Sequence, residues 1–380
     1  MKKIRFVNAK VVTRHEVLET ELSIDAGQIV SIAGGPSLSD CEDVDLQGDY
    51  LLPGLIEMHT DNLEKNILPR PGVLWPSILA SALAHDVQIA GSGITTVYDA
   101  LAIGGLREGG LDKRILDESF DAICQGHQKK LFKADHFLHL RCEVADRRME
   151  SNLHQYGQHP LVKLISVMDH TPGQRQWTDI DKWRLYHRDK RWTDEQAERV
   201  RQDRLELQGK YAARNRAEAV RFAREKQIPL AAHDDTTTAD AEMSAADGIT
   251  ISEFPTTLSA ARRARQLGMA VIMGSPNVVR GNSHSGNVSA RDLAQLSLLD
   301  GLSSDYVPAS LLQAVFYLTQ HLNIPLPQAV AMTSANIAEM VGLEDRGEIA
   351  VAKKADLVHV TLIDDLPVVK NVWRSGRLVV

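Results

Sequence analysis

Cysteine is scarce in this sequence of 380 residues. Only Cys41, Cys124 and Cys142 occur, and neither their number nor their spacing suits a disulfide framework or a thiolate zinc site. Long apolar runs are also lacking, since no stretch approaches the roughly 20 uninterrupted apolar residues that a membrane span requires. Positive charge is outweighed, with 43 Lys and Arg against 50 Asp and Glu, which argues against a nucleic-acid or anionic-membrane surface. We therefore expect a soluble, cytoplasmic protein in which phosphate contacts are local.

The two ends of the chain share a strand-like texture. Residues 1–50 alternate apolar and polar positions, and the same alternation returns from Gly347 to the C-terminus. The basic start is read as a strand and not as a signal peptide, because Asn8 and Lys10 interrupt the apolar run. Neither end buries a core alone, so we expect residues 1–50 and 347–380 to pair as one small β-sandwich domain.

Between these ends, from residue 51 to 346, short apolar runs alternate with helical periodicity. This rhythm predicts repeated strand-helix units around a parallel sheet. The eight candidate strands lie in LLPGLIEMH, GITTVYDA, HFLHLRCEV, LVKLISVMDH, IPLAAHDD, GITISEFP, MAVIMGSP and GLSSDYV. Eight such units predict an α/β fold, a TIM-like (β/α)8 barrel, and the chain is long enough for a barrel with a small appended domain.

A polar, charge-rich segment at about residues 173–216 breaks this rhythm and is too long for an ordinary connection. It has helical patterning in WTDEQAERVRQDRLELQGKYAARNR. An insertion at this point of a barrel lies above the C-terminal ends of the strands, which suits a lid or an oligomer contact. A solvated helical excursion with neither role is equally compatible with the composition.

Candidate metal ligands stand at the ends of the expected strands, where such a barrel carries its chemistry. His59 and Asp61 lie two residues apart at the end of the first strand, so both side chains point to the barrel axis. The other candidates at strand ends are Glu143, His170, His233 and Asp305. Single histidines are often merely packed or exposed, but these stand near acidic residues, which favours metal ligation. The adjacent Asp169, Asp234 and Asp235 are expected to bind strand-end backbone or to support the histidines.

These residue types also bear on the cofactor. A mixed set of imidazoles and carboxylates accepts zinc, manganese, magnesium or iron, according to geometry and supply. We expect two divalent metal ions, with zinc as the first candidate.

The string PGLIEMHTDN, residues 53–62, resembles the PGxIDxHxH opening of the amidohydrolase superfamily, with Asp61 where the second histidine normally stands. GLEDRGEIAVAKKADLVHV resembles the closing signature of the same enzymes. The resemblance implies that Asp305 holds one metal and acts as general base toward the attacking water. It also implies that Glu143 is the carboxylate shared between two metals.

The strand numbering leaves one ligand open. His170 and His233 fall on the fourth and fifth expected strands, whereas the superfamily usually draws these histidines from the fifth and sixth. Glu253 occupies the sixth strand and is the alternative ligand there. Lys163 is the other candidate for the shared position, but it lies at the start of its strand.

Longer strings narrow the resemblance to the PhnM family of phosphonate metabolism. They are HTDNLEKNILPRPGVLWP, SGITTVYDA, LHLRCE, MDHTPGQRQ, SEFPTT and MGSPNVVRGNSHSGN, and the likeness runs over nearly the whole chain. It implies a metal-dependent diphosphatase that hydrolyses alpha-D-ribose 1-methylphosphonate 5-triphosphate to the 5-phosphate and pyrophosphate, the step before carbon–phosphorus bond cleavage in the C-P lyase pathway. The bond broken is then P–O and not C–N.

A triphosphate brings several negative charges into a net-acidic protein, so cations must gather at the cavity mouth. The candidates for binding it are Arg70, Arg175 and Arg280, which follow strand ends, and in addition Lys65 and His284. The string VVRGNSHSGN is rich in Gly, Ser and Asn, so its backbone amides suit an anion nest. Arginine and lysine are usually exposed, and a surface cation without a ligand is the alternative for each.

Two other functions stay open at this point. An amidohydrolase acting on a C–N bond, such as a deacetylase or a cyclic amidase, would have nearly the same ligands but no use for the three arginines together. A non-catalytic scaffold of the same fold typically loses ligands, whereas here the set is complete. Homodimers are common among such barrels, but no segment of the sequence indicates an interface.

Overall fold

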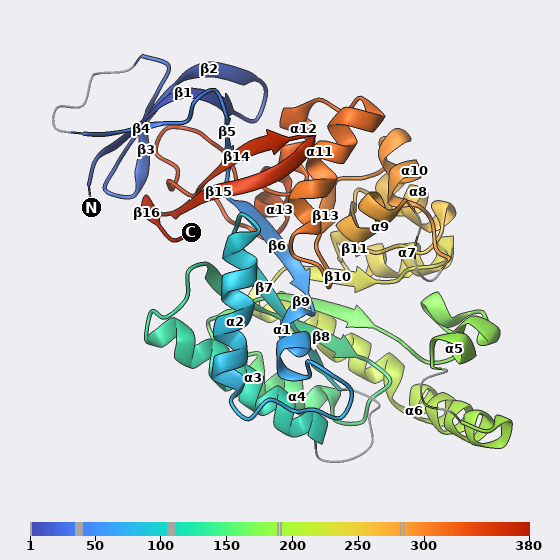
Figure 1. Ribbon diagram of the computed structural model, residues 1–380. Helices are drawn as coiled ribbons and strands as arrows, with labels where there is room; N and C mark the ends of the chain where they lie inside the picture. The colour runs from blue at the N-terminus through green and yellow to red at the C-terminus, as the bar shows by residue number, and fades with distance from the viewer. Residues whose placement is uncertain are drawn as a thin grey trace.

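The computed structural model describes residues 2–34, 41–104, 111–187, 190, 192–281, 283 and 286–380. They form two sheets, and the first sheet joins the two ends of the chain (Figure 1). Its strands are β1 (Ile4–Val12), β2 (Val17–Asp25), β3 (Gln28–Ile32), β4 (Glu42–Asp45), β5 (Tyr50–Pro53), β14 (Leu357–Ile363), β15 (Leu366–Arg374) and β16 (Arg377–Leu378). They pair in the order β16-β15-β14-β5-β1-β2-β3, and β4 also pairs with β1. The pairing of the two ends that the sequence predicts is therefore confirmed.

One buried apolar cluster holds this terminal sheet together. Phe6, Leu22 and Ile24 come from the N-terminal strands, and Trp373 comes from β15. The rings of Phe6 and Trp373 meet edge to face with their centroids 4.8 Å apart. The N-terminal hairpin strands thus complete their core only with a residue from the other end of the chain.

The second sheet is a barrel of eight parallel strands in chain order. They are β6 (Leu55–Thr60), β7 (Ile94–Ile103), β8 (Asp135–Glu143), β9 (Val162–Met168), β10 (Leu230–His233), β11 (Ile251–Glu253), β12 (Ala270–Gly274) and β13 (Gly301–Ser303). Each overlaps one of the eight runs expected from the sequence, so the predicted barrel is confirmed. Between the first and last strands, Thr60 forms a parallel bridge with Asp305, and the Asp61 amide donates to the Asp305 carbonyl at 3.2 Å. This contact brings two predicted ligands side by side.

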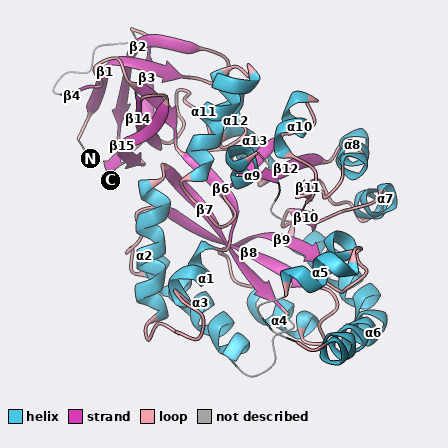
Figure 2. Ribbon diagram, turned by 45° about the vertical axis from the view of Figure 1, so that its right-hand side comes forward, coloured by secondary structure: helices cyan, strands magenta, loops and turns pink. Residues whose placement is uncertain are grey.

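Helices cover the outside of the barrel (Figure 2). They are α1 (Asn62–Ile67), α2 (Ile78–Gly91), α3 (Leu111–Gln128), α4 (Met149–Tyr156), α5 (Ile180–Tyr186), α6 (Asp194–Lys226), α7 (Thr238–Ala246), α8 (Leu258–Gln266), α9 (Ser275–Arg280), α10 (Ala290–Gln295), α11 (Ser310–Leu322), α12 (Leu326–Ala331) and α13 (Ala335–Met340). In the part of the chain that the structure describes, none of them is long and apolar enough to cross a membrane.

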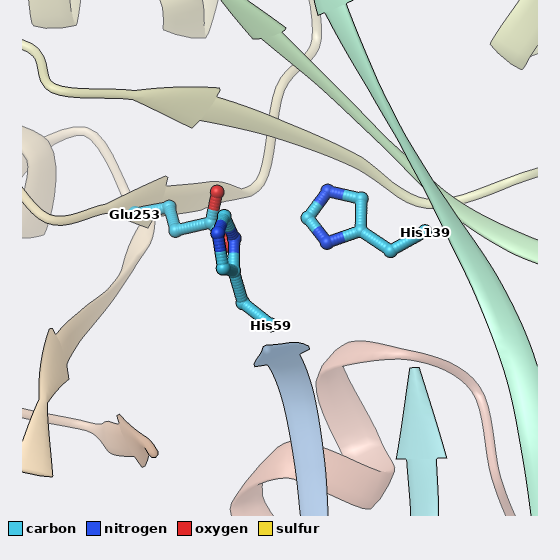
Figure 3. Close-up of side chains that lie close together, drawn as sticks. All are labelled: His59, His139 and Glu253. Atoms are coloured by element: carbon cyan, nitrogen blue, oxygen red, sulfur yellow. The ribbon is translucent and has the colours of Figure 1, made fainter. Parts of the chain in front are cut away.

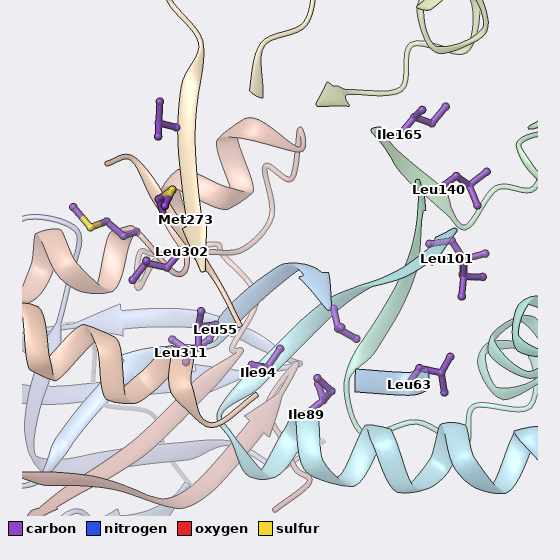
Figure 4. Packing of buried hydrophobic residues seen from close by; sticks show 14 of the residues in the cluster. Leu55, Leu63, Ile89, Ile94, Leu101, Leu140, Ile165, Met273, Leu302 and Leu311 are labelled. Atoms are coloured by element: carbon purple, nitrogen blue, oxygen red, sulfur yellow. The ribbon is translucent and has the colours of Figure 1, made fainter. Parts of the chain in front are cut away.

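The main apolar core lies between strands and helices, because alternate strand residues face outward. Figure 4 shows Leu101 and Leu140 of the strands together with Ile89 of α2 in this cluster. The neighbouring strand positions belong to a smaller cluster inside the barrel, which includes Tyr98 and Leu164. The interior near the strand starts is thus filled with side chains, which leaves the C-terminal ends for the functional site.

The segment between β9 and β10 departs from the ordinary barrel repeat. It holds a 3-10 turn at Arg175–Trp177, then α5, then α6, which runs for 33 residues from a Thr193 capping box. Phe222 near the end of α6 packs in the main core, whereas Trp183 and Ala197 belong to a separate small cluster at the other end. The helical pattern expected within residues 173–216 is thus part of a single helix that also serves as the crossover between two barrel strands.

Candidate metal centre

A cavity of about 610 Å³ opens at the C-terminal ends of the barrel strands. All six residues that the sequence predicts as ligands line it, namely His59, Asp61, Glu143, His170, His233 and Asp305. They come from five different strand ends that the barrel closure places in one ring.

Glu253, at the end of β11, holds two of these histidines from behind. Its Oε1 accepts a hydrogen bond from His59 Nδ1 at 2.8 Å, and its Oε2 accepts one from His233 Nδ1 at 2.9 Å. Because each Nδ1 carries its proton toward Glu253, each Nε2 keeps its lone pair for another partner. Burial raises the pKa of Glu253, but the charge of His59 and the hydrogen bonds from His59 and His233 outweigh it and hold that pKa well below its ordinary value. Glu253 thus hydrogen-bonds to both rings in this structure, and the alternative that it is itself a ligand stays open.

His170 is held in the same way by Glu143. Glu143 Oε2 accepts from His170 Nδ1 at 2.8 Å, and Oε1 accepts from the His170 amide at 3.2 Å. Both carboxylate oxygens are therefore directed at His170. In this arrangement Glu143 fixes the orientation of His170, and its role as a carboxylate shared between two metals stays a prediction.

Asp234 places a carboxylate oxygen close to both His170 and His233. Its Oδ2 lies 3.8 Å from His170 Nε2 and 3.5 Å from His233 Nε2, and this buried oxygen has no hydrogen-bond partner among the described residues. Burial lowers the pKa of His170, but the carboxylates of Asp234 and Glu143 outweigh it and raise that pKa to about 9. The same negative charges that favour a proton on His170 also favour a metal cation bound beside it.

Asp61 and Asp305 complete the other side of the cavity floor. Asp61 Oδ1 lies 4.0 Å from His59 Nε2, and both Asp61 oxygens accept hydrogen bonds from Arg141 Nη1 at 2.8 and 3.0 Å. Burial, together with the charge of Asp61, raises the pKa of Asp305. Within the described ranges, the Asp305 carboxylate accepts no hydrogen bond, so its oxygens remain free to bind a cation or a proton.

These donors fit divalent cations. His59, Asp61 and Asp305 place one ligand atom each within 4.8 Å of one another, and His170, His233 and Asp234 do the same. Imidazole nitrogens mixed with carboxylate oxygens are donors that zinc and its first-row neighbours accept. The buried, unpartnered Asp234 oxygen supports this assignment, because such a group is costly unless a cation satisfies it.

His139 of β8 is a further buried histidine that the sequence interpretation passed over. Figure 3 shows it beside His59 and Glu253. Its Nε2 bonds with Ser166 Oγ at 2.8 Å and its Nδ1 with the Met58 carbonyl at 3.1 Å, and burial lowers its pKa to about 3. Both nitrogens are occupied, so His139 packs the barrel interior as a neutral ring.

The predicted cations separate into two groups. Lys65 and Arg280 line the cavity, and Lys65 Nζ donates to the Tyr306 carbonyl at 2.7 Å. Arg175 is buried, and its Nη1 pairs with Asp235 and lies 3.5 Å from Asp240. Arg175 and the exposed Arg70 are not among the residues that line the cavity. His284 lies outside the described residues.

Arg141 was missed in the sequence, and Asp234 was expected only to bind backbone or to support the histidines. Arg141 shares the inner side of β8 with His139 and Glu143, so the period-2 alternation in HLRCE contained its signal. Asp234 follows His233 directly, and consecutive strand residues face opposite sides. Asp234 reaches the same cavity because its backbone φ is 60° at the strand end. No residue pattern in the sequence predicts this backbone conformation.

A second cluster of histidines and carboxylates lies on the outside of the barrel wall, between β7, β8 and α2. Asp99 Oδ1 bonds with His85 Nε2 at 2.8 Å, and Asp99 Oδ2 bonds with His136 Nδ1 at 2.7 Å. His136 Nε2 bonds with Asp86 at 3.2 Å, and His85 Nδ1 bonds with Asn62 at 3.0 Å. All four ring nitrogens are therefore occupied by protein partners, and the cluster is fully buried.

Comparisons with known proteins identify relatives of this chain. The model of the amidohydrolase family matches residues 199–379. Alpha-D-ribose 1-methylphosphonate 5-triphosphate diphosphatase of Escherichia coli (strain K12) is 44% identical over 375 residues, which cover 98% of this chain and 99% of that protein.

Solved structures resemble the chain over almost its whole length. A Xaa-Pro dipeptidase with bound methionine in the active site has a TM-score of 0.68 at 15% identity, and N-acetylglucosamine-6-phosphate deacetylase from Pasteurella multocida has 0.63 at 14%, with 99% of each chain covered in both cases. N-isopropylammelide isopropylaminohydrolase from Burkholderia multivorans has 0.67 at 12%, with 100% of this chain and 98% of that chain covered. At such low identities the likeness concerns the fold alone.

Proposed function

Because this chain belongs to the amidohydrolase family and to the branch that contains the Escherichia coli diphosphatase, we propose that it catalyses the same reaction. Its substrate is alpha-D-ribose 1-methylphosphonate 5-triphosphate, and its products are the 5-phosphate and pyrophosphate. The observation that carries this proposal is one cavity with metal-binding imidazoles and carboxylates at its floor and Lys65 and Arg280 on its wall. Such a site suits a polyanion bound to cations.

The cofactor is a pair of divalent ions, with zinc as the first candidate. One group of ligands is His59, Asp61 and Asp305, and the other is His170, His233 and Asp234. When bound, such ions draw charge from phosphoryl oxygens and lower the pKa of nearby water.

The chain's own residues supply the remaining chemistry. A water molecule attacks the phosphorus nearest the ribose, and the Asp305 carboxylate accepts its proton. The P–O bond to the second phosphoryl group breaks, and its electron pair leaves with pyrophosphate. Lys65 and Arg280 neutralise the charge that develops on this leaving group. Glu253 and Glu143 keep the three histidines oriented, and Arg141 does the same for Asp61.

The alternative reaction, hydrolysis of a C–N bond, has weaker support. Neither the reaction of the 44% identical relative nor the cations on the cavity wall favour a neutral amide substrate. We assign the protein to the cytoplasm, where its three free cysteines suit a reducing compartment.

Phosphorus NMR of the metal-loaded protein with the triphosphate substrate tests the reaction directly. We expect pyrophosphate from wild type and none from Asp305→Asn at matched metal content. Asp292→Asn, which removes an exposed carboxylate of α10 away from the cavity, is the matched control and should behave as wild type. If the metal-loaded wild type releases no pyrophosphate, the proposed reaction is wrong, and a panel of amides becomes the next test.

A further inference from the structure

Arg204 of α6 also lines the cavity, although no motif in the sequence singles it out. Its guanidinium lies 5.8 Å from the ring centroid of Trp183. Burial lowers the pKa of Arg204, and the charge that opposes this effect is that of Glu143. Both oxygens of Glu143 are already directed at His170, so Glu143 is not a partner in direct contact.

Arg204 differs from several arginines of its helix that are paired with carboxylates. Arg201 pairs with Glu198, Arg214 with Glu150, and Arg216 with Asp247. No hydrogen bond or ion pair of the Arg204 side chain occurs among the residues that the structure describes. A half-buried cation without a counter-ion is costly, and an anionic ligand in the cavity removes that cost.

The position of Arg204 in the ring of strands is opposite to that of the other cavity cations. Lys65 follows β6 and Arg280 follows β12, so both lie around the β12-β13-β6 side of the barrel. Arg204 belongs to the segment after β9, which is three strands away from both β6 and β12. Figure 1 shows α5 and α6 beside the C-terminal ends of β8 and β9. The metal-binding residues lie between these two walls.

The wall around Arg204 is aromatic. Trp177 and His187 line the cavity beside it, and His187 stacks on Trp192 with ring centroids 5.6 Å apart. Flat apolar rings beside a guanidinium fork suit the face of a sugar that carries an anionic substituent. The opposite wall presents a lysine and an arginine, which suit a chain of phosphates.

We propose that Arg204 binds the phosphonate on C1 of the ribose and makes the enzyme specific for substrates that carry it. This inference rests on the proposed function, and it assigns the two anionic ends of the substrate to opposite walls of the cavity. Pyrophosphate leaves on the side of Lys65 and Arg280, while the phosphonate monoester stays against α6. The guanidinium donates two parallel hydrogen bonds to the two free phosphonate oxygens.

The test compares two substrates in three proteins. The substrates are the 1-methylphosphonate of ribose 5-triphosphate and ribose 5-triphosphate itself, and the proteins are wild type, Arg204→Met and the control Arg201→Met. We expect Arg204→Met to lower kcat/KM by about 10- to 100-fold on the phosphonate substrate only, through a higher KM. Arg201→Met should match wild type on both, because Arg201 is paired with Glu198 outside the cavity. Arg204→Lys keeps the charge without the fork and should fall between.

Calorimetry gives a readout that does not depend on turnover. The metal-loaded proteins are titrated with ribose 1-methylphosphonate 5-phosphate and with ribose 5-phosphate. We expect wild type to bind the first more tightly and Arg204→Met to bind both alike, at unchanged metal content and thermal stability. This pattern supports the inference even if wild type releases no pyrophosphate, in which case only the proposed reaction fails. If Arg204→Met loses affinity equally for both ligands, Arg204 binds the 5-phosphate and not the phosphonate. If it loses affinity for neither, Arg204 does not contact the ligand. Each result overturns the inference.

Discussion

Two clusters of the same residue types occupy the two sides of the barrel wall. In the inner cluster, Glu253 bonds with His59 Nδ1 and His233 Nδ1. In the outer cluster, Asp99 bonds with His85 and His136 in nearly the same way. The difference lies in the remaining nitrogens, which face the cavity in the inner cluster and bond with Asn62 and Asp86 in the outer one.

This difference separates a candidate metal site from a buried network that supports the fold. A carboxylate between two imidazoles fixes their orientation in both cases. Metal binding needs in addition a free lone pair on each ring and room for the ion, and only the inner cluster adjoins a cavity. The outer cluster instead ties α2 to β7 and β8 through a closed set of hydrogen bonds, which makes it a buried network that stabilises the fold.

The largest contrast should come from removing one histidine on each side. His59→Ala loses a ligand, and we expect kcat/KM to fall by about 10³-fold or more, with less bound metal, because the ion's electrostatic contribution is several kcal/mol. His85→Ala should keep its metal and much of its kcat. Metal analysis and steady-state kinetics on both variants measure the contrast. Equal metal loss in the two variants would contradict the division between site and support.

Changing the central carboxylate of each cluster gives a smaller but sharper comparison. Asp99→Asn removes the buried carboxylate that His85 and His136 share, and we expect the free energy of unfolding in urea to fall by about 3–5 kcal/mol. Glu253→Gln should weaken metal affinity by about 10- to 100-fold and change stability less in the metal-loaded protein. Both substitutions keep the shape of the side chain. A Glu253→Gln variant with wild-type metal affinity would show that this carboxylate does not orient the ligands.

The smallest effect is a pH dependence confined to the outer cluster. Burial lowers the pKa of His136, but Asp99 and Asp86 outweigh it and raise that pKa from 6.5 to about 9. A raised pKa in the folded state means that the charged ring stabilises the fold fully below pH 6.5 and loses this effect as pH rises through about 9. The free energy of unfolding should therefore fall more steeply over this range in wild type than in His136→Gln. Parallel curves would mean that His136 is neutral in the folded protein.

The barrel could be predicted from the sequence because its signals are local, and so could the gathering of the candidate ligands in one cavity. Each strand is a short apolar run, and the candidate ligands His59, His170 and His233 stand at strand ends. The roles of the cationic residues were harder to predict, because a sequence does not show which arginine or lysine pairs with which carboxylate. Arg175 follows a strand end as expected, yet it pairs with Asp235, while Arg204 resembles every other arginine of a charged helix until its neighbours are known.

The outer cluster shows the same limit. Asp99 stands near the end of the expected run GITTVYDA, much as His233 stands near the end of its own run, although β7 continues to Ile103. The side that a residue faces depends on strand parity, but its role depends on what the opposite helix contributes. In this cluster, α2 contributes His85, which bonds with Asp99, and Asp86, which bonds with His136.

Helix α6 is a single rod of 33 residues, roughly 50 Å long, that is anchored at one end and works at the other. Phe222 fixes its last turns in the barrel core, while Arg204 stands about five turns earlier, beside the cavity. The helix therefore separates two tasks along its length. Substitutions around Phe222 alter the packing of the barrel, whereas substitutions around Arg204 alter one wall of the cavity.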